Sequence, residues 1–212
     1  MLIAEELLLL SLDPARGRPL NGSESVIGVC LTGALVAELG LAGGVVWNGS
    51  RFSPVGAAPD GLLGEVHAVL QGDRPRRAQA QLRRLDRALH GVRRRLVNGL
   101  VDAGVLGRER PRLWVPTSHP LLQVAARTEP LERVRSAAAS DGDLDARTAV
   151  LLALSGPARL LEVVADKPHA HAKKRMAEAA EMIPAAAVVK KVIAEVMAAT
   201  TAAIVASTSA AS

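Results

Sequence analysis

Aromatic side chains are almost absent from this 212-residue chain, which has two tryptophans, one phenylalanine and no tyrosine. Nearly half of its residues are apolar, so the core must be built from leucine, valine and alanine. A chain of this length can bury one substantial core. Because leucine and alanine favour helices, we expect a mainly α-helical protein.

Cysteine is also scarce, since Cys30 is the only one and lies in the apolar run 26–41. A single cysteine excludes an intrachain disulfide and a cysteine-rich zinc site. Met1 is followed by Leu-Ile-Ala-Glu-Glu, which lacks the basic start of a secretory signal. The sequence therefore predicts a protein of the reducing cytoplasm.

Long hydrophobic segments and catalytic motifs are missing as well. The longest uncharged run, 196–212, consists largely of alanine, threonine and serine. It is too short and too weakly apolar to cross a bilayer of roughly 30 Å, so any membrane contact is expected to be peripheral. No phosphate-binding glycine loop, dinucleotide fingerprint or nucleophile elbow occurs, so we expect neither an enzyme nor a cofactor. His169 and His171 diverge on a helix and have no third ligand nearby, so no metal site is predicted.

Positive charge is concentrated in one region. The chain carries a net charge of +5. Between positions 74 and 112, twelve arginines stand against three acidic residues, giving +9 and leaving −4 for the remainder. A GC-rich genome explains a high total of arginine but not this clustering, which is typical of a surface for nucleic acid or anionic membrane.

Periodicity and turn residues predict the order of elements. Helices are expected over 3–12, 26–41 and 62–71, on both sides of Gly91, and from Pro130 onward. The run 26–41 is apolar nearly all round, which indicates a buried central helix capped by Ser25, with Glu38 as its internal charge. Asn48-Gly49 predicts a hairpin between 45–47 and 50–52, and a second hairpin is expected with its turn at 107–111. Further breaks are expected at 13–14, 140–142, 156–157, 167–168 and 184.

The helix after Gly91 carries the most informative arginine. Its buried face is defined by Val92, Leu96 and Leu100. Arg93 then lies at the rim of this face, whereas Arg94 and Arg95 point away. Because an arginine cannot lose its charge, Arg93 needs an anion. Two partners stay open: a core carboxylate such as Glu38 or Glu6, or a bound phosphate group.

The segment 89–115 also resembles a winged helix, in which a recognition helix precedes a β-hairpin wing. This interpretation makes a nucleic-acid-binding protein the alternative function. Its weakness is that Val97, Leu100 and Val101 leave few outward polar positions for reading bases.

Six blocks in fixed order span almost the whole chain. They are EELLLLSL at 5–12, LTGALVAEL at 31–39, VRRRL at 92–96, LVDAGVL at 100–106, TSHP at 117–120 and RTAVLLAL at 147–154. Together they resemble the Golgi phosphoprotein 3 (GPP34) family, and in particular its bacterial, actinomycete-type members.

The resemblance implies a single mainly α-helical domain over 1–206, with a central helix ringed by further helices, short β-hairpins of which one protrudes, and a frayed tail at 207–212. It also implies a non-enzymatic peripheral membrane protein on the cytoplasmic face of a membrane. Such a protein binds phosphatidylinositol 4-phosphate in a basic pocket and acts as an adaptor. Eukaryotic relatives recruit Golgi glycosyltransferases in this way.

The pocket of the relatives maps onto this chain residue by residue. Val92-Arg93 matches the family's VR motif, so the resemblance makes Arg93 the pocket arginine. Two further pocket arginines of relatives fall on His90 and Thr32, and the pocket tryptophan falls near Ser23. Arg94 adds charge beside them, and each basic residue near an anionic surface contributes about 1 kcal/mol of attraction.

The segment 105–115 corresponds to the hairpin that inserts into membranes or self-associates in relatives. Its apolar residues are Leu106, Leu113 and Trp114. Trp114 suits a membrane interface, and packing back onto the body is the open alternative. The expected partners are thus a phosphoinositide-like anionic phospholipid, a second copy through the hairpin, and an unidentified protein cargo, with nucleic acid less favoured.

Overall fold

The computed structural model describes residues 1–20, 23–72, 77–109, 118–186 and 188. The fold is mainly helical, as expected. The helices are α1 (Ile3–Ser11), α2 (Ile27–Leu41), α3 (Gly61–Gln71), α4 (Ala78–Ala88), α5 (Val92–Asp102), α6 (Ala125–Ala139), α7 (Ala146–Ser155), α8 (Leu161–Val164) and α9 (Ala170–Met182), and the strands are β1 (Val45–Trp47) and β2 (Phe52–Pro54).

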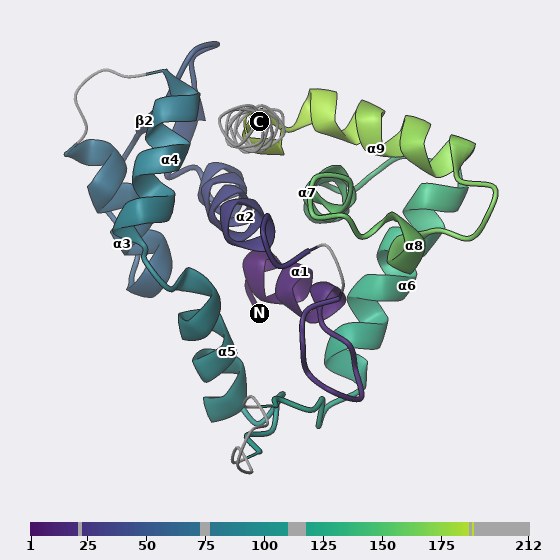
Figure 1. Ribbon diagram of the computed structural model, residues 1–212. Helices are drawn as coiled ribbons and strands as arrows, with labels where there is room; N and C mark the ends of the chain where they lie inside the picture. Colours follow the sequence, from purple (N-terminus) through teal and green to yellow (C-terminus); the bar gives the residue numbers. More distant parts are fainter. Residues whose placement is uncertain (21–22, 73–76, 110–117, 187, 189–212) are drawn as a thin grey trace, which may run out of the picture.

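α2 lies at the centre of the molecule beside α1 and α7 (Figure 1). α3, α4 and α5 form one flank, and α6, α8 and α9 form the other. Most of the side chains of α2 are buried, on all sides of the helix. Apolar residues all round a helix require neighbours all round it. The predicted arrangement, one domain with a buried central helix ringed by further helices, is therefore confirmed.

Helix boundaries follow the predicted breaks, with two corrections. α1 ends at Ser11, and the breaks at 140–142, 156–157, 167–168 and 184 lie at helix boundaries. Ser25 does not cap α2, because Val26 holds the cap position and no side chain bonds the first turn. α6 begins at Ala125 rather than Pro130, which lies buried inside the helix. Pro130 is the sixth residue of α6, past the first turn, where a proline removes the bond to the carbonyl of Ala126; the helix nevertheless continues through it, so this proline does not mark the helix start.

β1 and β2 form the predicted hairpin, but its loop is longer than expected. Trp47 pairs with Phe52, which leaves four residues, 48–51, in the turn. The rings of Trp47 and Phe52 contact each other at a centroid distance of 5.0 Å. The side-chain amide of Gln81 on α4 bonds both the N–H and the carbonyl of Phe52. The hairpin is therefore fixed against the same flank that carries α4.

A cluster of ion pairs joins α1, α2, α6 and α7 on the inside. Glu6, which is 5% exposed, accepts hydrogen bonds from Arg133 at 2.7 Å and Arg147 at 3.1 Å. Arg147 also lies 3.3 Å from Glu38 on α2. Buried carboxylates require such partners. Both core carboxylates are therefore neutralised by arginines from the second half of the chain.

No helix within the described part of the chain is long and apolar enough to cross a membrane. The predicted tail at 207–212 lies outside the described residues.

Candidate functional site

α5 presents its first turn and two of its arginines, Arg93 and Arg94, to a surface cleft. Gly91 precedes the helix with φ of +76°, a left-handed conformation that glycine adopts without strain, and it separates α5 from α4. No side chain caps the helix start, and the first turn holds no acidic residue. A helix N-terminus carries a partial positive charge and exposed N–H groups. This end of α5 is consequently suited to an anion.

Two segments distant in sequence form the opposite wall of the cleft. One is the loop that follows α1, and the other is an arm in which Leu106 pairs with Leu121 and Glu109 pairs with Ser118. The loop contacts the arm directly, because the hydroxyl of Ser118 donates to the carbonyl of Arg16 at 2.7 Å. The opposite wall of the cleft therefore forms only when residues about a hundred positions apart in the sequence come into contact.

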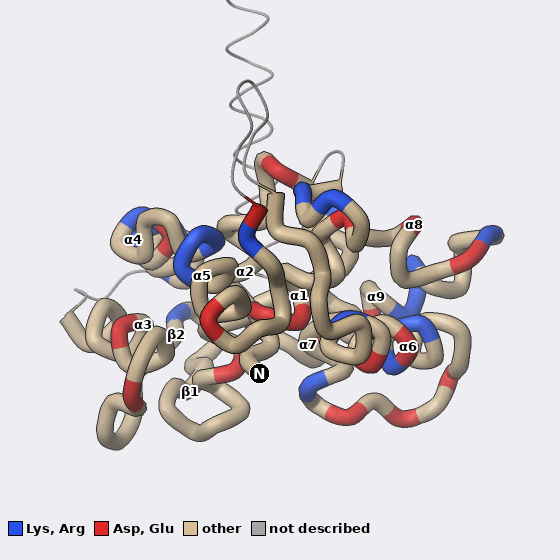
Figure 2. Tube along the Cα trace, turned by 90° about the horizontal axis from the view of Figure 1, so that it is seen from below, with Lys and Arg blue, Asp and Glu red and all other residues tan. Residues whose placement is uncertain are grey.

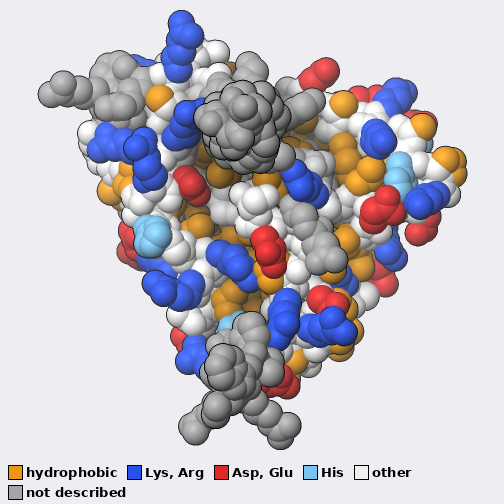
Figure 3. Space-filling model, viewed as in Figure 1, with side chains coloured by type: hydrophobic (Ala, Val, Ile, Leu, Met, Phe, Trp, Pro, Cys, Tyr) orange, Lys and Arg blue, Asp and Glu red, His pale blue; other side chains and the backbone are white. Residues whose placement is uncertain are grey.

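The cleft has a volume of about 850 Å³. It is lined by Gly17, Arg18, Pro19, Glu24, His90, Gly91, Arg93, Arg94, Val97, Asn98, Arg108 and His119. Figure 3 shows basic side chains over α4 and α5 on this face. Figure 2 shows the same basic positions along α4 and α5, and it shows acidic positions on the loop between α6 and α7. The four arginines and one glutamate of the lining leave three net positive charges, without counting the two histidines.

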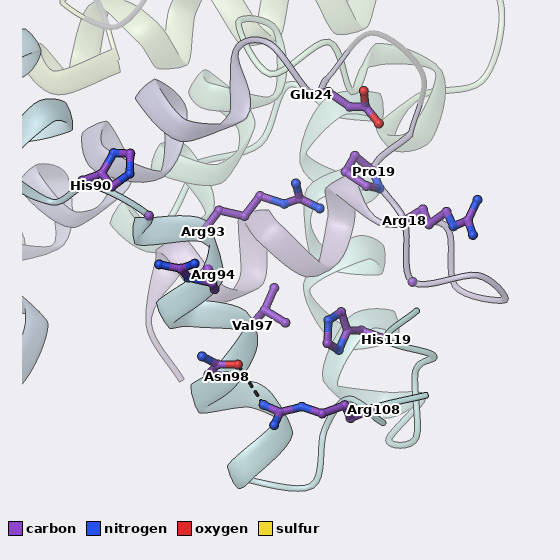
Figure 4. A pocket seen from close by; sticks show the side chains of 12 residues that line it. Arg18, Pro19, Glu24, His90, Arg93, Arg94, Val97, Asn98, Arg108 and His119 are labelled. Carbon is purple, nitrogen blue, oxygen red and sulfur yellow. Dashed lines mark hydrogen bonds between the residues drawn. The ribbon is translucent and has the colours of Figure 1, made fainter. Parts of the chain in front are cut away.

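Arg93 extends from α5 into the middle of the cleft (Figure 4). Arg93 as a whole is half-buried, and the Nε atom of its guanidinium is buried with no hydrogen-bond partner. The open alternative of a core carboxylate partner is wrong. Glu6 is paired with Arg133 and Arg147, and Glu38 with Arg147. Among the residues that the structure describes, Arg93 has no ion-pair partner.

His90 and Arg94 also line the cleft, both with exposed residues. His90 lies near Asp86 of α4. Burial raises the pKa of the Asp86 carboxyl above its usual range. A hydrogen bond from Thr32 and the electrostatic effect of His90 act in the opposite direction and are smaller. Arg95 differs from Arg94, because it forms a two-pronged ion pair with Glu65 on α3. Of the three consecutive arginines, Arg93 and Arg94 are thus the two that face the cleft.

Thr32 and Ser23 lie elsewhere. Thr32 is fully buried on α2, and its hydroxyl donates to the carbonyl of Gly28 at 3.1 Å and to Asp86 at 3.4 Å. Ser23 is also fully buried, and its hydroxyl donates to the carbonyl of Leu20. Short side chains satisfied by their own backbone do not reach the cleft. Neither residue lines it, in contrast to the expectation.

The expected protruding hairpin has a different register. Glu109 pairs with Ser118, so it belongs to the paired part of the arm rather than to the turn expected at 107–111. Leu106 is 2% exposed and belongs to the hydrophobic core, so the expectation that it faces a membrane or a second copy is wrong. Leu113 and Trp114 lie outside the described residues.

Sequence reasoning missed the residues that complete the cleft. They are Arg18, Glu24, Asn98, Arg108 and His119. Arg18 lies in a loop recognisable as basic, and Arg108 belongs to the arginine-rich region, but neither signal says that they meet α5. The meeting of these residues with α5 depends on the contact between the loop after α1 and the arm, which is not local in the sequence. His169 and His171 stay apart from this site and lie 3.5 Å from Glu162 and 3.9 Å from Asp141, respectively.

A comparison with protein families matches residues 3–196 of the chain to the family described as Golgi phosphoprotein 3 (GPP34). No individually curated protein matches the chain. The family match covers nearly the whole chain and includes every element that forms the cleft. By this match, and with the helical fold expected for it, the chain belongs to the Golgi phosphoprotein 3 (GPP34) family.

Proposed function

We propose that this protein binds the headgroup of an anionic phospholipid, phosphatidylinositol 4-phosphate or a close chemical relative of it, in the cleft in front of α5. It acts as a non-enzymatic adaptor that associates peripherally with the cytoplasmic face of a membrane. Membership of the Golgi phosphoprotein 3 (GPP34) family supports the adaptor role. The residues of the cleft support the choice of an anionic lipid headgroup.

The observation that carries the proposal is the state of Arg93. Arg93 lines the cleft, its Nε is buried without a hydrogen-bond partner, and the core carboxylates Glu6 and Glu38 are already paired with other arginines. A buried donor without a partner is costly, and the planar guanidinium matches a phosphate group with two parallel hydrogen bonds. A headgroup phosphate in the cleft would supply an ion-pair partner for the guanidinium charge of Arg93, which has none among the described residues.

The surroundings of Arg93 add attraction for an anion. The uncapped start of α5 and the exposed guanidinium of Arg94 lie beside it. Arginines on α4 and α5 extend the basic surface on the same flank (Figure 3). Such basic surfaces attract anionic leaflets over about a Debye length, roughly 8 Å at physiological salt. Long-range attraction and a specific pocket therefore act on the same face.

Duplex nucleic acid is disfavoured by the polar side chains of α5. Arg95 is tied to Glu65, and the side-chain oxygen of Asn98 accepts a hydrogen bond from Arg108 at 2.9 Å. Base readout requires such side chains to project freely from a helix into the groove.

Flotation with liposomes tests the proposal. Vesicles carrying phosphatidylinositol 4-phosphate and vesicles carrying phosphatidylserine are compared at matched net charge, with the wild type and the Arg93→Ala variant. We expect wild type to favour the phosphoinositide and Arg93→Ala to bind it at least tenfold more weakly, since a charge-assisted hydrogen bond contributes about 1.5–3 kcal/mol.

Arg87→Ala is the matched control. Arg87 is exposed on α4, does not line the cleft, and its loss removes the same charge from the same flank. Equal losses in both variants would mean that overall charge drives binding and would remove Arg93 from the site. Failure to float, combined with duplex binding that falls steeply with salt, would replace the lipid proposal with nucleic-acid binding.

A further inference from the structure

Two of the residues that line the cleft are histidines, and they come from opposite walls. His90 lies between α4 and α5, and His119 lies on the arm (Figure 4). Imidazole is the side chain that ordinarily changes its charge between about pH 5 and pH 8, whereas arginine stays charged. Protonation of both rings would add two charges to the three net positive charges of the lining. The charge of this cleft therefore depends on pH.

The hydrogen bond of His119 decides what its ring can offer to a ligand. Nδ1 of His119 lies 3.1 Å from the carbonyl oxygen of Gly107. A carbonyl oxygen only accepts, so Nδ1 carries a hydrogen in the neutral ring as well as in the charged ring. In the neutral ring Nε2 holds a lone pair, which repels a phosphate oxygen. Protonation turns Nε2 into a donor, so His119 can bind an anion only in its charged form.

The backbone of His119 is closely packed against the loop that follows α1. Gly17 in this loop has φ of +58°, and a Cβ atom there would overlap the backbone of His119. Only glycine permits this approach of loop to arm. The bond from Ser118 to the carbonyl of Arg16 lies at the same contact. Because two contacts fix this part of the arm, and the ring of His119 is directed toward α5 (Figure 4), a change of its charge acts on the cleft.

His90 is exposed and has charges of both signs near it. Burial raises the pKa of the Asp86 carboxyl, while a hydrogen bond from Thr32 and the electrostatic effect of His90 lower it. The electrostatic interaction is mutual, so the ionised form of Asp86 favours the protonated ring of His90. Arg94 acts in the opposite direction, because its guanidinium lies over Gly91, the residue that follows His90. An anion bound between Arg94 and His90 would remove this opposition.

The charged groups around the two histidines come from every element of the cleft. They are Asp86 on α4, Arg93 and Arg94 on α5, Arg18 and Glu24 on the loop between α1 and α2, and Arg108 on the arm. Positive charge predominates among them and opposes protonation of either ring in the empty cleft. A bound phosphate reverses this balance, so binding takes up protons. Because coupling between two binding events is reciprocal, protonation of the rings strengthens the binding of the anion.

We propose that His90 and His119 make the cleft a pH-dependent anion site, which holds an anionic lipid headgroup more tightly as the pH falls from about 8 to about 5.5. The inference rests on the proposed lipid binding and adds a regulation of the same site. Arg93 supplies a contact that does not change with pH, and the two histidines adjust the strength of binding around it.

Vesicle binding as a function of pH tests the proposal. Phosphatidylglycerol vesicles are used because their phosphodiester keeps one negative charge throughout this range. Vesicles with phosphatidylinositol 4-phosphate are run in parallel, and comparison with variants at each pH removes the titration of its own phosphate, near pH 6. We expect the wild type to bind roughly tenfold more tightly at the lower pH. The double variant His90→Gln with His119→Gln should change little, and His90→Arg should bind more tightly than the wild type at the higher pH.

His171→Gln is the matched control, because His171 lies 3.9 Å from Asp141 and does not line the cleft. Its pH dependence should equal that of the wild type, and thermal melts check that all variants are folded. Proton uptake gives a readout that a merely structural role of the histidines would not move. Calorimetric titration with phosphatidylglycerol vesicles in two buffers of different ionisation enthalpy should show protons taken up by the wild type and almost none by the double variant.

The outcomes separate the pH dependence from the proposed function. Binding that is constant over the pH range, or a pH dependence that survives in the double variant, overturns the role of the two histidines and leaves lipid binding in place. A pH dependence lost equally in His171→Gln overturns it as well, since overall charge would then be the cause. Absence of binding to both kinds of vesicle at every pH overturns the proposed function and this inference together.

Discussion

Three consecutive arginines on α5 have different chemical roles because their neighbours differ. Arg95 is paired with Glu65, and this pairing raises the pKa of Arg95 and lowers that of the Glu65 carboxyl. Both side chains are more than two-fifths exposed, so the pair adds little stability. Arg94 is exposed at the helix start, and Arg93 is half-buried with an unpartnered Nε. A run of identical residues thus supplies one arginine in a surface ion pair and two that line the candidate cleft, of which only Arg93 is half-buried.

Cys30 is predicted to be unreactive in the folded protein. Burial, with a smaller effect from Asp86, raises the pKa of its thiol to about 12. Because the thiolate is the nucleophile, a maleimide or disulfide reagent at pH 8 should label the native protein very slowly and the urea-unfolded protein completely. Rapid labelling of the native chain, followed by mass spectrometry, would contradict the burial of Cys30.

The same shift sets a direction for stability. A thiol pKa raised by folding stabilises the folded state below the pKa of the unfolded thiol, roughly 8.5. This stability is lost as the pH rises from there toward 12.

At the scale of elements, the start of α7 is the clearest case of a helix cap formed by residues that are neighbours in the sequence. Asp145 holds the cap position and accepts a hydrogen bond from the backbone N–H of Thr148 at 3.0 Å. The hydroxyl of Thr148 donates to the same carboxylate. These bonds hold the pKa of the Asp145 carboxyl below its usual range, the side-chain bond contributing most.

Asp145→Ala should lower the free energy of unfolding by about 1 kcal/mol, the usual contribution of a helix cap. Because folding lowers the pKa of Asp145, its contribution is present above roughly pH 4 and is lost as the pH falls through the folded value. Urea unfolding at pH 7 and pH 3 measures this. A difference between wild type and variant that is the same at both pH values would contradict the carboxylate as the source.

Elements with strong local signals were predicted well from the sequence, and the candidate site only in part. The apolar run that became α2, and Asn48-Gly49 of the β1–β2 turn, carry their structure in neighbouring residues. Arg93 could be placed because helical periodicity puts it at the rim of a buried face. Arg18 and His119 could not, because they meet α5 only through contacts between distant segments.

At the scale of the molecule, the cluster of ion pairs around the buried Glu6 connects the two halves of the chain. Glu6 of α1 bonds Arg133 of α6 and Arg147 of α7, whose second partner is Glu38 of α2. Sequence reasoning considered these carboxylates as partners for Arg93, since burial can be predicted from local pattern but pairing cannot. Because these carboxylates pair with arginines from the second half of the chain, Arg93 is left available for the proposed ligand.

Glu6→Gln should destabilise the whole domain rather than one helix. Removing the charge leaves two arginines, each about one-third exposed, with weakened partners, and we expect a loss of about 1–3 kcal/mol. Calorimetry should show a single transition at lower temperature. A separate early transition of α1 would contradict the view that the cluster couples both halves. Glu129→Gln, an exposed carboxylate on α6, is the control and should melt as wild type does.

The contact between Trp47 and Phe52 makes this protein convenient for spectroscopy. Trp47 lies in the β1–β2 hairpin and does not line the cleft, and the chain contains one other tryptophan, Trp114, and no tyrosine. In a Trp47→Phe variant, all indole emission comes from position 114, in the sequence between the two paired segments of the arm that supplies Arg108 and His119. A chain so poor in aromatics is thus reduced by one substitution to a single indole, whose place in the sequence lies between the segments that supply Arg108 and His119 to the candidate cleft.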